Sequence, residues 1–146
     1  MTSFLGFKES VMSSFMKFVS IMAVCGFSWM ASAQEGTVKI LSPKDGATVT
    51  SPFKVKMGAE GIKVRPAGEA VDEKTSGHHH ILINQSAVPA GQVIPTDDKH
   101  LHFGKAQTET EVKLEPGEYT LTLQFGDGAH RSYGEKLSHT IKIKVK

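Results

Sequence analysis

Apolar and polar residues alternate one by one along several short stretches of this 146-residue chain, and no other feature constrains its fold as much. Residues 53–57, 119–125 and 141–145 each place an apolar side chain at every second position. A period of two gives a strand one buried and one solvated face. Beyond residue 33, no stretch of ordinary helix length repeats its apolar residues every 3.6 positions. The sequence therefore predicts an all-β protein.

Turn sequences divide the alternating stretches into seven or eight short strands. Ser-Pro-Lys-Asp-Gly at 42–46 and Glu-Pro-Gly at 115–117 are typical turns, and residues 66–77 and 85–99 read as longer loops. This pattern favours a small antiparallel immunoglobulin-like β-sandwich, with a small β-barrel as the alternative. Tyr119, just after the Glu-Pro-Gly turn, is a candidate corner tyrosine of such a sandwich.

The first 33 residues are predicted to be a secretory signal peptide, and residues 34–146 a single β-sandwich domain. Two lysines precede an apolar run, and Ala-Ser-Ala at 31–33 is a small-residue cleavage site. Translation could start at Met1 or at Met12. The apolar run is shorter than the roughly 20 residues that span a bilayer. We therefore expect a periplasmic or secreted protein with no membrane span after cleavage.

Cleavage of this leader would narrow the available chemistry. The leader carries the sole Cys, the sole Trp and five of the six Met, so Met57 supplies the last sulfur. Disulfides, thiolate metal sites and cysteine nucleophiles are thereby excluded. All seven His remain, and 15 Lys and Arg nearly balance 14 Asp and Glu, because the leader removes two Lys and one Glu. A charge this close to neutral predicts no nucleic-acid partner.

Five of the seven histidines fall in two short segments, Gly-His-His-His-Ile-Leu-Ile-Asn at 77–84 and His-Leu-His-Phe-Gly at 100–104. Residues two apart on a strand share a face, with Cα atoms about 6.6 Å apart. Two such imidazoles can lean together onto one metal ion, which binds imidazole nitrogen at about 2.0–2.1 Å. His78 with His80 forms one such pair, and His100 with His102 forms another.

The apolar neighbours indicate which way some of these histidines face. In the second segment the apolar residues favour the core, so His100 and His102 should face outward or into a cleft. The phase of the first segment stays open, because three apolar residues follow one another. If Ile81 and Ile83 face the core, His79 shares their face, and His78 and His80 lie on the outer face. His130, in the loop after residue 128, could add a ligand, whereas His139 keeps the core phase and is interpreted as structural.

Histidine clusters of this kind indicate a metal site more often than a single histidine does. Imidazole suits copper, zinc, nickel and iron, and outside the cytoplasm Cu(II) and Zn(II) lead this group. Asp97, Asp98 and Asp127 are the carboxylates that could ligate the ion or orient a histidine. The sequence does not choose between copper and zinc. The predicted metal ligands are His78, His79, His80, His100, His102 and His130.

At these motifs the sequence resembles a secreted bacterial family catalogued as domain of unknown function 4399. The resemblance rests on residues 77–84, on residues 100–109, and on Leu-Glu-Pro-Gly at 114–117 leading to Asp127 and His130. It extends over roughly residues 38–145. It implies export and a small β-rich domain, with no activity assigned. The residues that match the family's histidine positions are His78, His79, His80, His102 and His130.

These observations leave three functional hypotheses. The first is an extracytoplasmic domain that binds copper or zinc for buffering, delivery or sensing. The second is an immunoglobulin-like envelope module, with an envelope protein as partner and histidines that are structural. The third is a metalloenzyme with an open coordination position, for which Asp97, Asp98 and Glu109 are only nominal bases. We rank them in that order and assign no catalytic residue.

Overall fold

The computed structural model describes residues 36–146, so the predicted leader, its cleavage site, the alternative start and the domain boundary at 33/34 lie outside the described residues. Within that range the chain is all-β, as the alternation predicts. One short 3-10 helix, η1 (Glu135–Leu137), precedes the last strand. The strands are β1 (Thr37–Ser42), β2 (Ala47–Val49), β3 (Phe53–Glu60), β4 (Lys63–Val64), β5 (Ser76–Ile83), β6 (His100–His102), β7 (Glu109–Val112), β8 (Gly117–Gly126) and β9 (Ser138–Val145).

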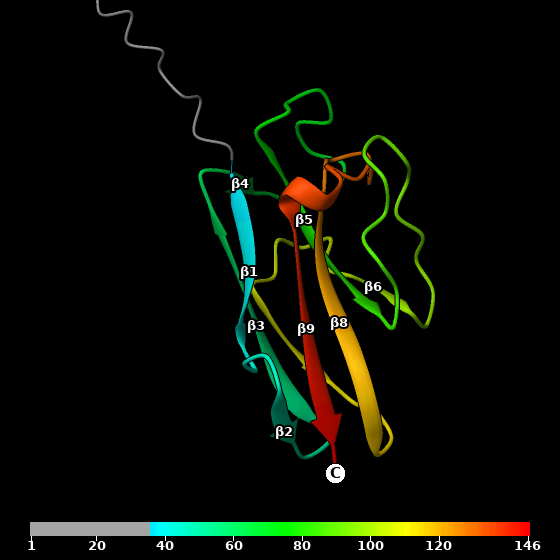
Figure 1. Cartoon of the computed structure of the whole chain (residues 1–146). Helices are drawn as coiled ribbons and strands as arrows, with labels where there is room; N and C mark the ends of the chain where they lie inside the picture. Colours follow the sequence, from blue (N-terminus) through cyan, green and yellow to red (C-terminus); the bar gives the residue numbers. More distant parts are fainter. Residues whose placement is uncertain (1–35) are drawn as a thin grey trace, which may run out of the picture. The chain divides into compact units, whose positions relative to one another are not determined.

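The strands form two sheets in a sandwich-like arrangement. The smaller sheet has the order β1-β3-β7, and the larger has the order β2-β9-β8-β5-β4, with β6 also paired to β5. β1 of the smaller sheet contacts β8 and β9 of the larger one, and Figure 1 shows these strands running alongside one another. Because β5 has β8 on one edge and β4 and β6 on the other, it lies inside the larger sheet.

The hydrophobic core lies between the two sheets and collects the apolar residues of the alternating stretches. Phe53, Val55 and Met57 enter it from β3, and residues of β5, β8 and β9 enter it from the opposite side. Ile81 and Leu82 are fully buried and Ile83 is 7% exposed, so this run is buried on both faces of the sheet.

Loops cover the other face of the larger sheet, which the alternation alone would leave in water. Leu82, Thr122 and Gln124 lie on that face and are fully buried. The Gln124 side chain accepts a hydrogen bond from the Val88 backbone N–H and donates one to the Gly134 carbonyl. Thr122 donates its hydroxyl to the carbonyl of Gln85. The loop at 85–99, yellow-green at the right of Figure 1, is thus fastened over this face.

The strand count and the strand directions correct the sequence prediction in detail. The described residues contain nine strands rather than seven or eight. The additional strand β2 has three residues, too few to show alternation, and follows directly after the predicted turn at 42–46. The sheets are mixed rather than purely antiparallel, because β2 pairs with β9 and β4 with β5 in parallel. Tyr119 behaves as a corner tyrosine, since its hydroxyl donates to the Glu115 carbonyl at 3.0 Å.

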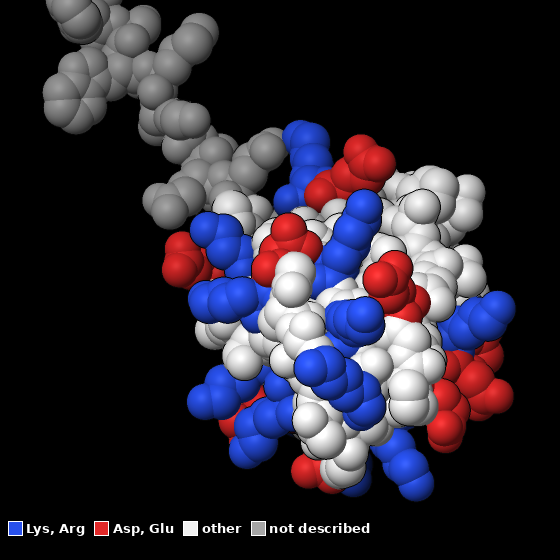
Figure 2. Space-filling view, turned by 60° about the horizontal axis from the view of Figure 1, so that its bottom comes forward, with Lys and Arg blue, Asp and Glu red and all other residues white. Residues whose placement is uncertain are grey.

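The surface carries charges of both signs. Figure 2 shows Lys and Arg side chains interleaved with Asp and Glu on one face of the molecule. One such pair is Lys54 with Glu109, at 3.2 Å across β3 and β7. Over residues 36–146, the fold includes no helix that is long and apolar enough to cross a membrane.

Leu121 offers a direct test of this core, because it is fully buried between the sheets. Leu121→Ala should lower the free energy of unfolding by about 2–5 kcal/mol, through lost burial and the cavity left behind. Val93→Ala is the control, since Val93 is 64% exposed, and should change stability by no more than about 0.5 kcal/mol. Urea unfolding followed by circular dichroism measures both. Equal effects of the two substitutions would contradict this packing.

Candidate metal centre

β5 resolves the open phase of the histidine run. His79 packs edge-to-face on Phe125, with ring centroids 5.1 Å apart, and so shares the core face with Ile81 and Ile83. His78 and His80 therefore project from the opposite face, beneath the covering loops. Both are fully buried although their strand face was expected to lie outside the core.

β6 brings His102 alongside His80. The two residues are direct partners in the antiparallel β5–β6 ladder, so their side chains leave the sheet on the same side. Two residues further on, Gly104 leaves room for the His102 ring: a Cβ at Gly104 would lie 2.3 Å from Cε1 and 2.6 Å from Nε2 of that ring. A side chain at position 104 would push His102 out of its present position.

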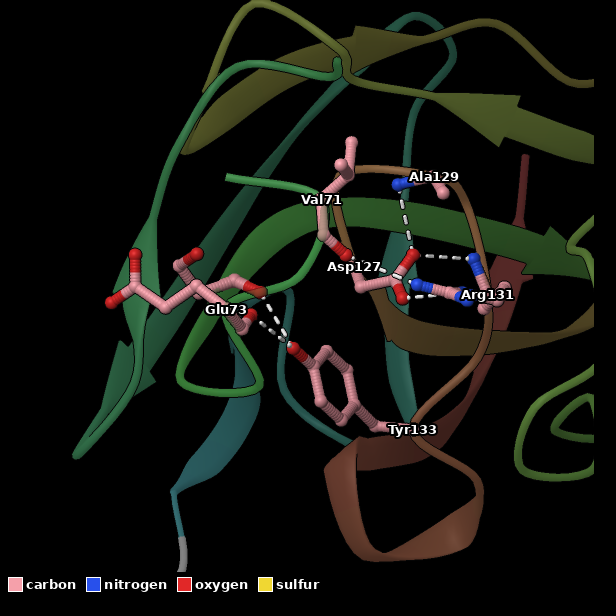
Figure 3. Close-up of polar contacts among 7 residues, drawn as sticks. Val71, Glu73, Asp127, Ala129, Arg131 and Tyr133 are labelled. Carbon is pink, nitrogen blue, oxygen red and sulfur yellow. Dashed lines mark hydrogen bonds and ion pairs between the residues drawn. The ribbon is translucent and has the colours of Figure 1, made fainter. Parts of the chain in front are cut away.

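His130 reaches the same place from the loop after β8. Its backbone has φ of 64°, in the left-handed region that non-glycine residues seldom adopt. The Asp127 carboxylate holds this tight turn: Oδ1 accepts from the N–H groups of Ala129 and Arg131 at 2.9 and 2.8 Å, and Oδ2 accepts from Arg131 Nε at 2.8 Å. Figure 3 shows the carboxylate at the centre of these contacts. Asp127 thus positions the loop that carries His130.

Two further connections fix this loop to its surroundings. Arg131 Nη2 donates to the carbonyl of Val71 at 3.0 Å, which ties the loop to the long 66–75 segment (Figure 3). On its other side, the Ile94 backbone N–H donates to the His130 carbonyl at 2.9 Å. Ile94 is 2% exposed and belongs to the covering loop at 85–99. The His130 loop is therefore held between the two long loops of the chain.

The four rings from β5, β6 and this loop form one group, which we call the four-histidine cluster: His78, His80, His102 and His130. Ring centroids of His78 lie 4.8, 5.0 and 4.9 Å from those of His80, His102 and His130. The Nε2 atoms of His102 and His130 are 3.2 Å apart. His78, His80 and His102 each offer one ring nitrogen within 4.8 Å of the others, a group that could hold a metal ion.

Burial, reinforced by neighbouring imidazoles, favours the neutral form of His78 and His80. Together these effects lower the pKa of His78 to about 4 and that of His80 to about 2. The Asp127 carboxylate acts in the opposite direction on the pKa of His78. Burial, followed by His130, also lowers the pKa of His102. At neutral pH the rings of His78, His80 and His102 are therefore neutral, and each carries a free nitrogen lone pair, the form that binds metal ions.

The buried ring nitrogens lack partners within the protein. Both nitrogens of His78 and both of His80 are buried without a hydrogen bond to any described residue. Buried polar atoms are nearly always hydrogen-bonded, and each exception calls for an explanation such as an ion. A set of lone pairs directed at one ion would account for one nitrogen of each ring.

Two of the predicted ligands lie outside the four-histidine cluster. His79 points into the core, where burial lowers its pKa to about 4. His100 lies opposite Leu82 in the ladder, and its Nδ1 is 2.8 Å from Asp97 Oδ1. His139, interpreted as structural, accepts a hydrogen bond from the Ile40 backbone N–H through Nδ1. Asp97 therefore orients a histidine, but one beside the cluster and not within it.

The sequence analysis missed the small residues that shape the cluster. A Cβ at Gly126, which pairs with His78, would lie 3.3 Å from His80 Nε2 and 3.0 Å from Ile94 Cδ1. The signal was present in both cases, because Gly104 ends the His-Leu-His-Phe-Gly motif and Gly126 begins Gly-Asp-Gly.

The buried imidazoles predict a pH dependence of stability in the metal-free protein. Unfolded histidines take up protons near pH 6.5, whereas folded His78 and His79 do so only near pH 4. The unfolded state thus binds more protons in this window, and stability falls as pH decreases from 6.5 to 4, by about 3 kcal/mol for each of the two. Urea unfolding in the presence of a chelator should show this loss. His79→Leu should make it shallower, and constant stability between pH 7 and 4.5 would refute it.

Comparison with known proteins places this chain in a family without assigning a chemistry. No curated protein matches the chain. Among solved structures, it is similar to part of the endo-β-1,4-mannanase from Thermotoga petrophila, with 14% identity and a TM-score of 0.46. That match covers 77% of this chain but 20% of the mannanase chain. A family model matches residues 55–146, which include the whole four-histidine cluster. The chain belongs to the family described as Domain of unknown function (DUF4399).

Proposed function

We propose that this protein is an extracytoplasmic metal-binding domain whose four-histidine cluster takes up a copper or zinc ion for buffering, delivery or sensing. The observation that carries the proposal is the convergence of His78, His80 and His102, from two adjacent strands, in a group that could hold an ion. His130 adds a fourth imidazole, 3.2 Å from His102. Imidazole nitrogen without thiolate is a ligand set suited to Zn(II) and Cu(II).

The chemistry of the cluster favours a ligand over a purely structural role. A buried structural histidine is expected to satisfy its ring nitrogens with hydrogen bonds, and His139 does so at Nδ1, which accepts from the Ile40 backbone N–H. His78 and His80 make no such bonds with described residues, although both are fully buried. Burying polar atoms in this way lowers stability unless a bound partner compensates. A metal ion supplies that compensation.

The surroundings of the cluster favour an exchangeable ion. Permanent metal sites usually fix each ligating histidine through a hydrogen bond from its second ring nitrogen to a carboxylate or carbonyl, and loss of such partners weakens binding about 10–100-fold. In the described structure His78 and His80 have no such partner for either nitrogen. A site of moderate affinity is suited to buffering or delivery, whereas an ion that only maintains the fold would be bound more tightly.

The compartment forms the other half of the proposal. The N-terminal features of a secretory leader support export, and the chain beyond it contains no cysteine. Export would place the histidines where Cu(II) and Zn(II) are the leading candidate ions. Determining the N-terminal residue of the protein isolated from the periplasmic fraction tests this compartment, because cleavage after residue 33 would leave Gln34 first.

Binding of one ion per chain is the direct test of the metal proposal. Untagged protein, stripped with a chelator, should bind close to one equivalent of Zn(II) or Cu(II) in isothermal titration calorimetry. His80→Ala or His102→Ala should weaken binding at least 100-fold, because each removes one of the converging nitrogens.

His100→Ala is the matched control. His100 lies on the same short strand as His102, but its ring contacts Asp97 instead of the cluster, so its loss should leave affinity unchanged. Circular dichroism at each step shows whether a variant has kept its fold. Unchanged binding in both cluster variants, or the absence of binding in the parent protein, would refute the proposed function.

A further inference from the structure

The arrangement of the four rings carries more information than their proximity. Five of the six centroid separations in the four-histidine cluster fall between 4.8 and 5.1 Å, and the sixth, between His80 and His130, is 6.0 Å. Six equal separations among four points define a regular tetrahedron. The cluster is therefore close to tetrahedral, opened along one edge.

This shape can be compared with the two common four-coordinate geometries. Four imidazoles bound at about 2.0–2.1 Å place their centroids about 5.2 Å apart in a tetrahedron. In a square they would lie about 4.5 Å apart along the sides and about 6.4 Å across both diagonals. If His80 and His130 were one diagonal, His78 and His102 would be the other, yet these two lie only 5.0 Å apart. The square arrangement is thus excluded by a single distance.

One pair of nitrogens already has the separation that this geometry requires. Two nitrogens bound to one tetrahedral ion at about 2.0–2.1 Å lie about 3.4 Å apart. The Nε2 atoms of His102 and His130 are already 3.2 Å apart. The nitrogens of His78, His80 and His102 lie within 4.8 Å of one another, so modest ring rotation would complete the set.

We propose that the four-histidine cluster is a closed tetrahedral site for Zn(II), with His130 as the fourth ligand and with no coordination position left for water or substrate. This inference rests on the proposed function and specifies its ion. Tetrahedral coordination is the usual geometry of zinc sites with four protein ligands, whereas Cu(II) and Ni(II) favour square-planar or tetragonal sites. A site closed by four protein ligands binds an ion without activating water, since catalytic zinc keeps its fourth position open.

The loop that carries His130 gives the tetrahedron its rigidity. Three hydrogen bonds to the Asp127 carboxylate fix the turn, and the Ile94 N–H holds the His130 carbonyl from the other side. A square would need the centroids of His78 and His102 to spread from 5.0 Å to about 6.4 Å, and these residues lie on the paired strands β5 and β6, which oppose that movement. Asp127 is accordingly a positioning residue for the fourth ligand.

Cobalt and nickel separate this inference from the proposed function. An adaptable nitrogen site binds Ni(II) more tightly than Co(II), following the usual order of divalent metals. A rigid tetrahedral site should reverse this order of affinity and bind Co(II) at least tenfold more tightly than Ni(II). Bound Co(II) should show the intense visible absorption of four-coordinate cobalt, and Zn(II) should displace it.

His130→Asn tests the fourth ligand without disturbing the backbone, because asparagine tolerates the left-handed conformation at φ of 64°. This variant should bind Co(II) at least tenfold more weakly, and the visible spectrum of the bound cobalt should change because water replaces an imidazole at the fourth position. His100→Ala is the control and should keep both the affinity and the spectrum of the parent protein. Asp127→Asn should weaken Co(II) binding less than His130→Asn, and it should leave the stoichiometry at one.

The outcomes distinguish the two levels of the account. Binding of one Co(II) with weak absorption, tighter binding of Ni(II) than of Co(II), or an unchanged spectrum in His130→Asn would each overturn the tetrahedral site while leaving metal binding intact. Failure of the parent protein to bind Zn(II), Co(II) or Cu(II) would overturn the proposed function itself. Intense absorption in the parent protein, with weaker Co(II) binding and a changed spectrum in His130→Asn, supports both.

Discussion

Pairing of β5 with β6 on one edge and with β8 on the other decides where the imidazoles of the candidate site lie. His80 faces His102 across the first ladder, and His78 faces Gly126 across the second. A slip of one residue in either ladder would send one set of side chains to the opposite face of the sheet. Packing of His79 against Phe125 opposes that slip and keeps Ile81 in the core. Core packing thus fixes the histidine geometry.

Much of this arrangement could be predicted from residue order alone. Alternation in 53–57, 119–125 and 141–145 predicts the strands that now enclose the core, and the spacing of His78 and His80 predicts their shared face. The sequence could not determine the phase of β5, since Ile81, Leu82 and Ile83 are all apolar. That phase depends on Phe125 of β8, against which His79 packs.

Long-range contacts account for the remainder of the site. A histidine on the outer face of a sheet is ordinarily wet, and nothing local to His78 or His80 shows that residues 85–99 cover them. That cover depends on contacts such as Ile94 with the His130 carbonyl, which join segments far apart in the sequence. His100 and His102 have the same spacing in the sequence as His78 and His80, but of the two only His102 reaches the cluster. His100 lies further along the ladder, opposite Leu82, and its ring contacts Asp97.

If four imidazoles surround one ion, a crystal structure of the zinc-loaded protein will show them at bonding distance from it. Anomalous scattering recorded on both sides of the zinc absorption edge locates the ion independently of the protein atoms. We expect one peak per chain, bonded at about 2.0–2.1 Å to His78, His80, His102 and His130. A zinc peak at His100 and Asp97, or no peak among the four rings, would contradict it.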